Sequence, residues 1–579
     1  MGGRYLSGVV SVGVKRFFSK GGIKINLPNA RAFVVILTFT TTIAYAQEIH
    51  FYGSNNVRFA DGTRLNSLQN LQFSGIEKSS GVTTGYLENW ADISAIYNNW
   101  FATFRYEFDD PSEYGLNRND IVNWSIYYDI ENYSLNAGTF EELFGRGLTL
   151  NLYEDRSIFY DNRLENGGKF KYDNDRFSAT FLRGNNLFYT TLDESTAKED
   201  YNNVTAAEFS ISPINRLNLG VSLVNVDRDT LSPDGTVLNK NNSGFRIKGY
   251  DRETGFYSIF AAYEGFDDWQ LYFERAENRI TSDTEVNGDG FYMAIGKSGG
   301  FPNLRMEYKN FRNFAADPND LDSPIGPYQN PPRVQRQNDL RLFELDPHFV
   351  RFNDEVGYLL EWRLPAISGE VQMLTGYGHS SLHEGKSVAP SAEKRMMPYR
   401  EIFFAVERFG TSKVSYWHFN VAVSNEIRYY STLPSNELVR FRDIDKISFG
   451  SEMELKIGKS LFDIRAEILR YSEVDTAKAR TISFSHGDEG NEYLLSLSYT
   501  PSGRFSVSTG TEWSSIEGDI IKNRAKGPWT FVEAKMEFMR NHNLTLWTGK
   551  VRGGRQCSGG VCRFVPDFDG FRLSLISRF

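Results

Sequence analysis

The chain has 579 residues, more than the roughly 250–300 that one ordinary globular core supports, so it forms either several domains or a closed, extensible architecture. Aromatic residues make up 15% of it, and 50 Gly accompany only 18 Pro, a composition that favours aromatic-rich strands over disorder, collagen or coiled coil. The net charge of −9 argues against nucleic acid as a partner, because phosphate binding needs excess Lys and Arg. Outside the N-terminal stretch, no run approaches the ~20 apolar residues of a membrane helix, which argues against a helical membrane protein.

The first 46 residues have the pattern of a secretory signal peptide. Residues 1–31 contain six Lys and Arg but no Asp or Glu, and the apolar stretch 32–46 follows directly. The small-x-small ending predicts cleavage between Ala46 and Gln47. The alternatives are a buried apolar strand or a membrane anchor, for which this apolar stretch is short. Removal of the leader takes away six positive charges and changes the net charge from −9 to −15.

The remaining chain, 47–579, shows the period-two alternation of amphipathic strands. The segment 100–108 places Trp100, Phe104 and Phe108 on one face and Arg105 and Glu107 on the other. The same alternation recurs in later segments, at 122–130, 177–181, 217–223 and 495–500. In a membrane barrel the apolar face would contact lipid and the polar face would contact water in the lumen.

The connections between these strands are of two kinds. Short turn signals, such as Asn174-Asp175 and Pro501-Ser502-Gly503, alternate with long polar stretches such as 227–242 and 517–526. This asymmetry predicts an all-β fold, a transmembrane antiparallel β-barrel of about 20–24 strands with short periplasmic turns and long extracellular loops. The alternative is a large secreted sandwich array or propeller, although the hairpins share no repeated motif.

The last strand carries an expected signal for the barrel-assembly machinery. Phe571, Leu573, Leu575 and Phe579 share one face, and this resembles the C-terminal strand of outer-membrane barrels, which ends in an aromatic residue. Ser577 departs from the pattern at a position that is usually apolar. The expected location is the bacterial outer membrane, with its lipid and the barrel-assembly machinery as partners.

Two segments, 141–165 and 313–352, interrupt the strand pattern. The first is dense in charges of both signs, which inside a pore create a transverse field that tunes selectivity. Both segments are interpreted as pore lining or as structural bracing, which includes an outer loop packed on itself; a binding site is a third alternative. The candidate pore-lining residues are Glu142, Arg146, Glu154, Arg156, Asp161 and Arg163.

Short motifs in and beside these segments carry a resemblance. They are FGRGL at 144–148, YEDR at 153–156, YDN at 160–162, NPP at 330–332, DPH at 346–348 and EVGY at 355–358. With them the chain resembles an uncharacterised family of porin-like outer-membrane barrels from Bacteroidetes and related bacteria. The resemblance covers most of the mature chain and implies the barrel, but it brings no established function or catalytic residue.

The two cysteines, Cys557 and Cys562, flank the spacer Ser-Gly-Gly-Val near the C-terminus. Exported compartments oxidise thiols, and this spacer can turn tightly enough to bring the two residues together, so a disulfide is predicted. Free thiols, or metal or redox chemistry, are the alternatives.

The sequence lacks the common enzyme signatures. Its Gly-Lys-Ser triplets lack the first glycine of a P-loop, and no G-x-S-x-G motif occurs. His379 and His383 are four residues apart in a Gly/Ser-rich stretch and not on a helix, which disfavours a shared metal ion. We therefore expect no enzyme, catalytic residue, cofactor or metal.

The expected function is a porin-like channel for passive passage of an unidentified small solute. The alternative is a surface adhesin or scaffold barrel of a secretion or surface-assembly complex, which a lumen blocked by 141–165 would favour. An outer-membrane enzyme is a third alternative. An energy-coupled receptor with a plug is not expected, because barrel-like strands begin close to the mature N-terminus, where such receptors have a globular plug.

Overall fold

The computed structural model describes residues 49–65, 82–109, 113, 118–156, 160–189, 199–231, 251–266, 268–281, 285–297, 303–314, 328–348, 350–365, 370–410, 414–432, 439–478, 483–516, 527–558, 561–565 and 567–579. Contacts divide the chain into a small unit, Met1–His50 with Ile96–Asn98, and a large unit, Phe51–Ala95 with Asn99–Phe579. The large unit is the barrel. The predicted signal peptide, including Ala46 and Gln47, lies outside the described residues.

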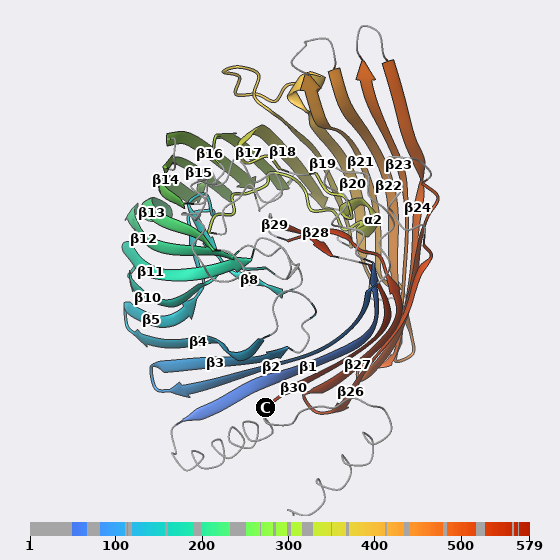
Figure 1. Cartoon of the computed structure of the whole chain (residues 1–579), viewed down its shortest axis with the longest axis horizontal. Helices are drawn as coiled ribbons and strands as arrows, with labels where there is room; N and C mark the ends of the chain where they lie inside the picture. Colours follow the sequence, from blue (N-terminus) through green and yellow to red (C-terminus); the bar gives the residue numbers. More distant parts are fainter. Residues whose placement is uncertain are drawn as a thin grey trace, which may run out of the picture. The chain divides into compact units, whose positions relative to one another are not determined.

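A 24-stranded antiparallel sheet closes on itself to form the barrel (Figure 1). Its strands are β1 (His50–Leu65), β2 (Val82–Tyr97), β3 (Trp100–Asp109), β4 (Arg118–Ile130), β5 (Tyr133–Phe140), β10 (Leu164–Asp173), β11 (Phe177–Tyr189), β12 (Glu199–Ile214), β13 (Leu217–Leu231), β14 (Asp251–Phe266), β15 (Trp269–Thr281), β16 (Glu285–Lys297), β17 (Asn303–Arg312), β18 (Asp354–Pro365), β19 (Val371–Ser381), β20 (Tyr399–Phe409), β21 (Val414–Thr432), β22 (Val439–Ile457), β23 (Ser460–Lys478), β24 (Ser483–Ser502), β25 (Phe505–Ser514), β26 (Trp529–Met539), β27 (His542–Val551) and β30 (Asp567–Arg578). The smaller elements are β6 (Glu142–Phe144), β7 (Leu150–Leu152), β8 (Glu154–Asp155), β9 (Tyr160–Asp161), α2 (Arg341–Glu344), η3 (Lys394–Met396), β28 (Gly554–Ser558) and β29 (Val561–Val565).

The first and last strands complete the ring. β1 pairs with β30 from Ser54 opposite Arg578 to Leu65 opposite Asp567. At the end of this seam, Gly53 and Phe579 exchange two backbone hydrogen bonds, of 2.8 and 3.0 Å. Closure leaves no free sheet edge, which a membrane requires because lipid cannot hydrogen-bond an exposed backbone. The predicted closed antiparallel barrel is confirmed.

Alternate residues of the strands face lipid and lumen, as the sequence pattern predicts. Phe104 of β3 is 44% exposed on the outer face, whereas Glu107 is buried on the inner face. On β24, Leu495, Leu497 and Tyr499 likewise point outward. On β30, Phe571 and Phe579 are exposed, whereas Arg572 lies against Phe568 inside the barrel. An apolar outer surface on a closed barrel places the chain in the bacterial outer membrane.

Helices contribute little to this fold. Within the described part of the chain, no helix combines the length and the apolar character that crossing a membrane requires.

The connections differ between the two rims of the barrel. Consecutive strands are antiparallel, so successive connections alternate between a rim of short turns, such as 131–132 and 458–459, and a rim of longer loops. The segments 141–163 and 313–353 connect β5 to β10 and β17 to β18, both at the long-loop rim. The two irregular segments therefore enter the barrel from one side.

The outward position of Leu497 predicts how the barrel responds to a charge facing lipid. Leu497→Arg should destabilise the folded barrel in vesicles by about 2–4 kcal/mol if this position lies near the bilayer midplane. Leu497→Ala, which removes the side chain without adding a charge, should cost clearly less. Urea titration of folding into lipid vesicles measures both. Equal costs for the two variants would contradict a lipid-facing position.

Candidate functional site

Two loops from the long-loop rim fold into the lumen and form what we call the plug, the described residues of 141–163 and 328–353. Their contacts lie on inward positions of the strands, between exposed outward neighbours: Ser222 between Val221 and Leu223, and Glu467 next to Ile468. Figure 1 shows β8 of the first loop and α2 of the second inside the ring of strands. The sequence marked both segments as irregular but did not predict that they pack together.

The two loops are hydrogen-bonded to each other. The backbone N–H of Asn151 donates to the carbonyl of Tyr328 at 2.8 Å, and the Gln329 amide donates to the carbonyl of Leu148 at 2.7 Å. The two loops therefore pack together as one plug.

The plug shares an apolar core with the inner wall. Buried plug side chains include Phe144, Leu148, Leu150, Leu152, Leu342 and Phe343. Buried wall side chains in the same cluster include Leu182, Val204, Val224, Phe256, Phe403 and Leu469. Under the plug, part of the inner face of the barrel is thus apolar and buried. Removing these side chains from water favours docking by about 25 cal/mol per Å² of apolar surface.

The FGRGL turn is bound by two carboxylates of the inner wall. The backbone N–H of Gly145 donates to Glu208 at 2.9 Å, and that of Arg146 donates to Glu274 at 3.0 Å. Glu274 also accepts from the Tyr272 hydroxyl at 2.7 Å. Gly145 has a φ of +52°, and a Cβ at this position would meet the Glu274 carboxylate at 2.6 Å. The turn therefore requires glycine both for its backbone and for its distance from the wall.

Charged residues of the first loop pair with each other and with the wall. Glu154 lies 2.9 Å from Arg105 of β3, 2.7 Å from Arg156 and 3.1 Å from Arg163. Arg156 also pairs with Glu107 of the wall at 2.8 Å. Burial alone would raise the pKa of Glu154, but the three guanidinium groups hold the pKa below its ordinary value. This network fastens the loop to β3.

The other predicted pore-lining residues lie elsewhere in the loop. Asp161 pairs with Arg163 at 2.9 Å, and Glu142 pairs with Lys169 of β10 at 3.0 Å. Arg146 is exposed, and its guanidinium lies over the Tyr272 ring at 5.0 Å. The structure thus brings Glu154, Arg156, Asp161 and Arg163 together and leaves Glu142 and Arg146 apart. That these six residues line a conducting pore stays a prediction.

The second loop is fastened by buried ionic groups that we call the docking cluster: Lys309, His348, Glu355 and Glu426. Lys309 of β17 pairs with Glu355 of β18 at 2.8 Å and donates to the carbonyl of Arg333 in the loop at 2.6 Å. His348 of the loop lies with Nδ1 2.8 Å from Glu426 of β21 and with Nε2 3.3 Å from Glu355. The Lys309 and Glu355 side chains are only 1% and 2% exposed, so each is the charged partner that compensates the other's burial.

Helix α2 is held by a wall carboxylate at its start. The backbone N–H groups of Arg341 and Leu342 donate to Glu467 of β23 at 3.1 and 2.9 Å. The Arg341 guanidinium reaches Glu512 of β25 at 2.5 Å. Asn338, just before the helix, donates to Glu401 of β20 at 2.6 Å. The wall strands β20, β21, β23 and β25 therefore hold the second loop through its backbone and its polar side chains.

Part of the docking cluster, together with Ser380, resembles the serine–histidine–acid chain of a hydrolase triad. Ser380 Oγ lies 3.4 Å from His348 Nε2, and His348 Nδ1 faces Glu426. However, Glu355 lies as close to Nε2 as the serine does, and all three side chains are buried. Both ring nitrogens of His348 therefore face carboxylates of the wall, and these contacts also fasten the second loop.

The two histidines that the sequence singled out do not meet at one site. His383 lies 2.5 Å from Asp354 and 3.0 Å from Asn310, whereas His379 packs edge-on against Tyr358. Within the described ranges, no group of three or more His, Cys, Asp or Glu is arranged to hold a metal ion.

The predicted disulfide falls on the hairpin of β28 and β29. Cys557 and Cys562 are direct cross-strand partners there. Their side chains lie outside the described residues, so the disulfide stays a prediction.

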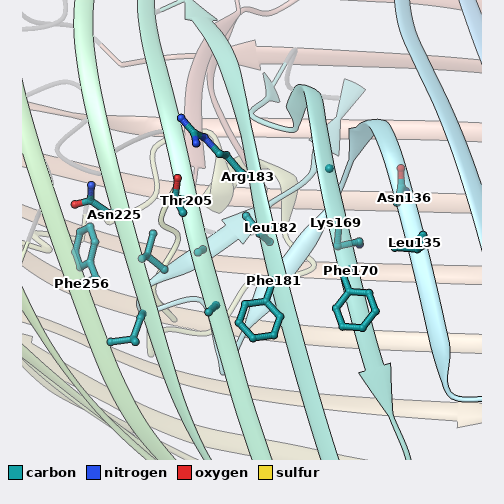
Figure 2. A pocket seen from close by; sticks show the side chains of 15 residues that line it. Leu135, Asn136, Lys169, Phe170, Phe181, Leu182, Arg183, Thr205, Asn225 and Phe256 are labelled. Carbon is teal, nitrogen blue, oxygen red and sulfur yellow. The ribbon is translucent and has the colours of Figure 1, made fainter.

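A shallow hollow of about 720 Å³ lies over β5 and β10–β14 (Figure 2). Phe181, Ala207 and Leu223 are neighbours on adjacent strands, and Phe181 and Leu223 point outward. Its lining also includes Leu182, Val224 and Phe256, which belong to the apolar core that the wall shares with the plug.

Sequence reasoning missed the wall carboxylates that bind the plug backbone, Glu208, Glu274 and Glu467. Each occupies an inward position of a strand, where an acidic residue looks like an ordinary lumen-facing one. The only sequence signal for them is their inward position on a strand, because the plug residues that they bind lie far away along the chain.

Comparisons with known proteins give a family but no activity. The model described as "Family of unknown function (DUF6029)" matches residues 30–579. No curated protein matches the sequence.

Several solved structures are similar in fold at low sequence identity. The apoprotein form of the FrpB iron transporter from Neisseria meningitidis (F5-1 variant) is 8% identical with a TM-score of 0.46, and covers 92% of this chain and 81% of its own. The copper transporter OprC is 10% identical with a TM-score of 0.43, with coverage of 92% and 81%. The P pilus usher (PapC) translocation pore is 10% identical with a TM-score of 0.38, with coverage of 92% and 99%. At these values, none brings a function to this chain.

The fit of the FGRGL turn predicts that Gly145→Ala loosens the plug. The added Cβ would displace the Glu274 carboxylate and weaken its bonds to the turn, a cost of about 1.5–3 kcal/mol for hydrogen bonds to a charged group. The matched control is Gly385→Ala, since Gly385 has a φ of +60° but nothing within 4 Å of a Cβ. Hydrogen exchange of amides 144–152 should quicken in the first variant only. Equal exchange in both variants would contradict the contact.

The raised pKa of Glu344 in α2 predicts that docking of the second loop weakens as pH rises. Burial, with the nearby Glu401 adding to it, raises the pKa of Glu344 to about 7. An undocked carboxyl has a pKa of about 4.3, so between pH 4.3 and 7 it ionises in the undocked loop while the docked one stays protonated. The penalty on docking grows across this window and is complete above pH 7.

Glu344→Gln should remove this pH dependence. Exchange of amides 338–348 should be faster at pH 8 than at pH 5 in the parent protein, after correction for the intrinsic rate. In the variant, the corrected protection should be nearly the same at both pH values. A parent protein equally protected at both would show that Glu344 does not titrate in this window.

Proposed function

We propose that this chain, which belongs to the DUF6029 family of unknown function, is a solute channel of the bacterial outer membrane whose lumen is narrowed by the plug. The observation that carries the proposal is the docking of two strand-connecting loops inside a 24-stranded barrel. Barrels of such size have wide lumens, and loops that fold inward are a known way to narrow or plug them.

The origin of the plug supports a channel over a barrel closed by a separate domain. Both loops connect neighbouring strands, β5 to β10 and β17 to β18, at the long-loop rim. A loop that is joined to wall strands at both ends can narrow the lumen but cannot leave the barrel as a separate plug domain can. Passage of small solutes beside the plug is then passive, and its selectivity is set by side chains that face the remaining space.

A scaffold or adhesin barrel is the second candidate. It is favoured by the same plug, because loops that fill the lumen serve a barrel whose task is to hold a partner at its surface. Affinity purification from solubilised outer membranes separates the candidates: a stoichiometric partner, together with no conductance of the purified barrel, supports the scaffold.

The docking cluster provides the test of the channel. Lys309→Met should leave Glu355 buried without its lysine and weaken docking by about 3–5 kcal/mol, the usual cost of breaking a buried ion pair on one side. In planar bilayers the variant should therefore show a larger or noisier conductance than the parent protein. Lys309→Met/Glu355→Gln, which leaves no unpaired charge, should return most of the way to the parent conductance.

A gel-mobility shift on boiling is the control that each variant has a folded barrel. A parent protein that passes no ions, together with a folded Lys309→Met variant that passes none either, would refute the channel.

A further inference from the structure

An acidic patch on the inner wall borders the plug on the side of the short-turn rim. Glu407, Glu452, Glu454 and Asp463 occupy inward positions of β20, β22 and β23. They continue the inward rows that hold the second loop, beyond Glu401 and Glu467. Asp339 of the plug, with its side chain 59% exposed, lies near the patch and interacts electrostatically with Tyr416 of β21.

The carboxylates of this patch are close neighbours. Glu407 and Glu452 lie on either side of His418 as its direct cross-strand partners, and Glu454 is opposite Asp463. Directly opposite side chains, such as Glu454 and Asp463, have Cβ atoms about 4.5–5.5 Å apart, whereas Glu407 and Glu452 are separated by the width of β21. Like charges at such distances repel unless a cation lies between them.

The nearby cations are already engaged or lie at the edge of the patch. Arg465 lies inside the patch as the direct cross-strand partner of Glu452, but it pairs with Glu467 at 2.6 Å. Arg336 pairs with Glu361 at 3.3 Å and with Asp339 at 3.5 Å. Lys456 follows two positions beyond Glu454, at the exposed end of β22. The patch therefore keeps a net negative charge.

A second, independent observation lies at the centre of the patch. His418 is 6% exposed, and its Nε2 has no hydrogen-bond partner, although it sits between Glu407 and Glu452. Two positions along the same face of β21, the amide oxygen and nitrogen of Asn420 also lack partners. A buried polar atom without a partner is costly, so a donor or acceptor supplied from outside would be favoured here.

The shape of the site decides between a metal ion and an organic cation. The described His, Asp and Glu side chains are not arranged to hold a metal ion. The carboxylates are spread over three strands, β20, β22 and β23, with the His418 imidazole of β21 between them. This spacing suits a cation that carries several N–H donors along its length.

Resting on the proposed channel, we propose that this acidic patch is a binding station in the lumen for small organic cations with primary amine or guanidinium groups. Glu407 and Glu452 attract the charge, and His418 Nε2 accepts a hydrogen bond from it. The passage beside the plug then prefers cations over anions.

Spermidine is the probe for this station. Calorimetric titration of the detergent-solubilised full barrel should show binding, and Glu407→Gln/Glu452→Gln should weaken it by about tenfold or more, about 1.4 kcal/mol per tenfold. Glu533→Gln/Glu537→Gln, which removes two inner-wall carboxylates of β26 instead, should bind as the parent does. His418→Leu should also weaken binding while leaving the charge of the patch unchanged.

Three results would overturn the station: no spermidine binding, equal loss in the β26 control, or full binding in His418→Leu. The reversal potential in a KCl gradient tests the selectivity separately and should shift toward zero in Glu407→Gln/Glu452→Gln only. Spermidine binding without any conductance would refute the channel and keep the station. Conductance without spermidine binding would do the reverse.

Discussion

Carboxylates on the inner wall need partners once water leaves, and the plug supplies them. Glu208 and Glu274 accept from backbone N–H groups of the FGRGL turn, and Glu467 accepts from two N–H groups at the start of α2. A buried carboxylate without donors costs several kcal/mol, and an unpaired backbone N–H is costly as well. Wall and plug therefore satisfy each other's hydrogen-bonding groups while the plug keeps water out.

This mutual dependence explains why the plug keeps one position. The apolar cluster supplies the driving force for docking but little direction, because apolar contacts tolerate small shifts. The carboxylates and the docking cluster supply the direction, since charge-assisted hydrogen bonds are short and geometrically selective. In the proposed channel, the passage is then bordered by fixed side chains, among them the acidic patch.

The barrel could be predicted from the sequence, because lipid imposes a rule that each strand follows locally. Phe104 and Leu497 face out because their neighbours along the strand face in, and 24 strands lie within the expected range. The plug could not be predicted in this way. Its first and second loops were visible as charge-dense or proline-bearing irregular segments, but their partners, such as Glu467 for Leu342, are distant in sequence and carry no local signal.

The candidate site shows the same division. The sequence pointed to Glu154, Arg156 and Arg163, and the structure brings the two arginines together around the Glu154 carboxylate, along with Arg105 of the wall. It gave no reason to select Lys309 or His348, because burial and ion pairing at these positions exist only after the second loop has folded onto β17, β18 and β21. Contact with lipid determines which strand residues face outward, whereas tertiary contacts determine which residues come together in the site.

Accessibility of a cysteine beneath the plug tests the central claim most directly. Ser222 is fully buried and bonded to Thr149 of the plug at 2.8 Å. In a background with Cys557 and Cys562 replaced by serine, Ser222→Cys should resist a membrane-impermeant maleimide in intact outer membranes, whereas Ser506→Cys, on the inner wall near the short-turn rim, should react with it. Rapid labelling of Ser222→Cys in a folded barrel would show that the loops do not occupy the lumen, and would contradict the account.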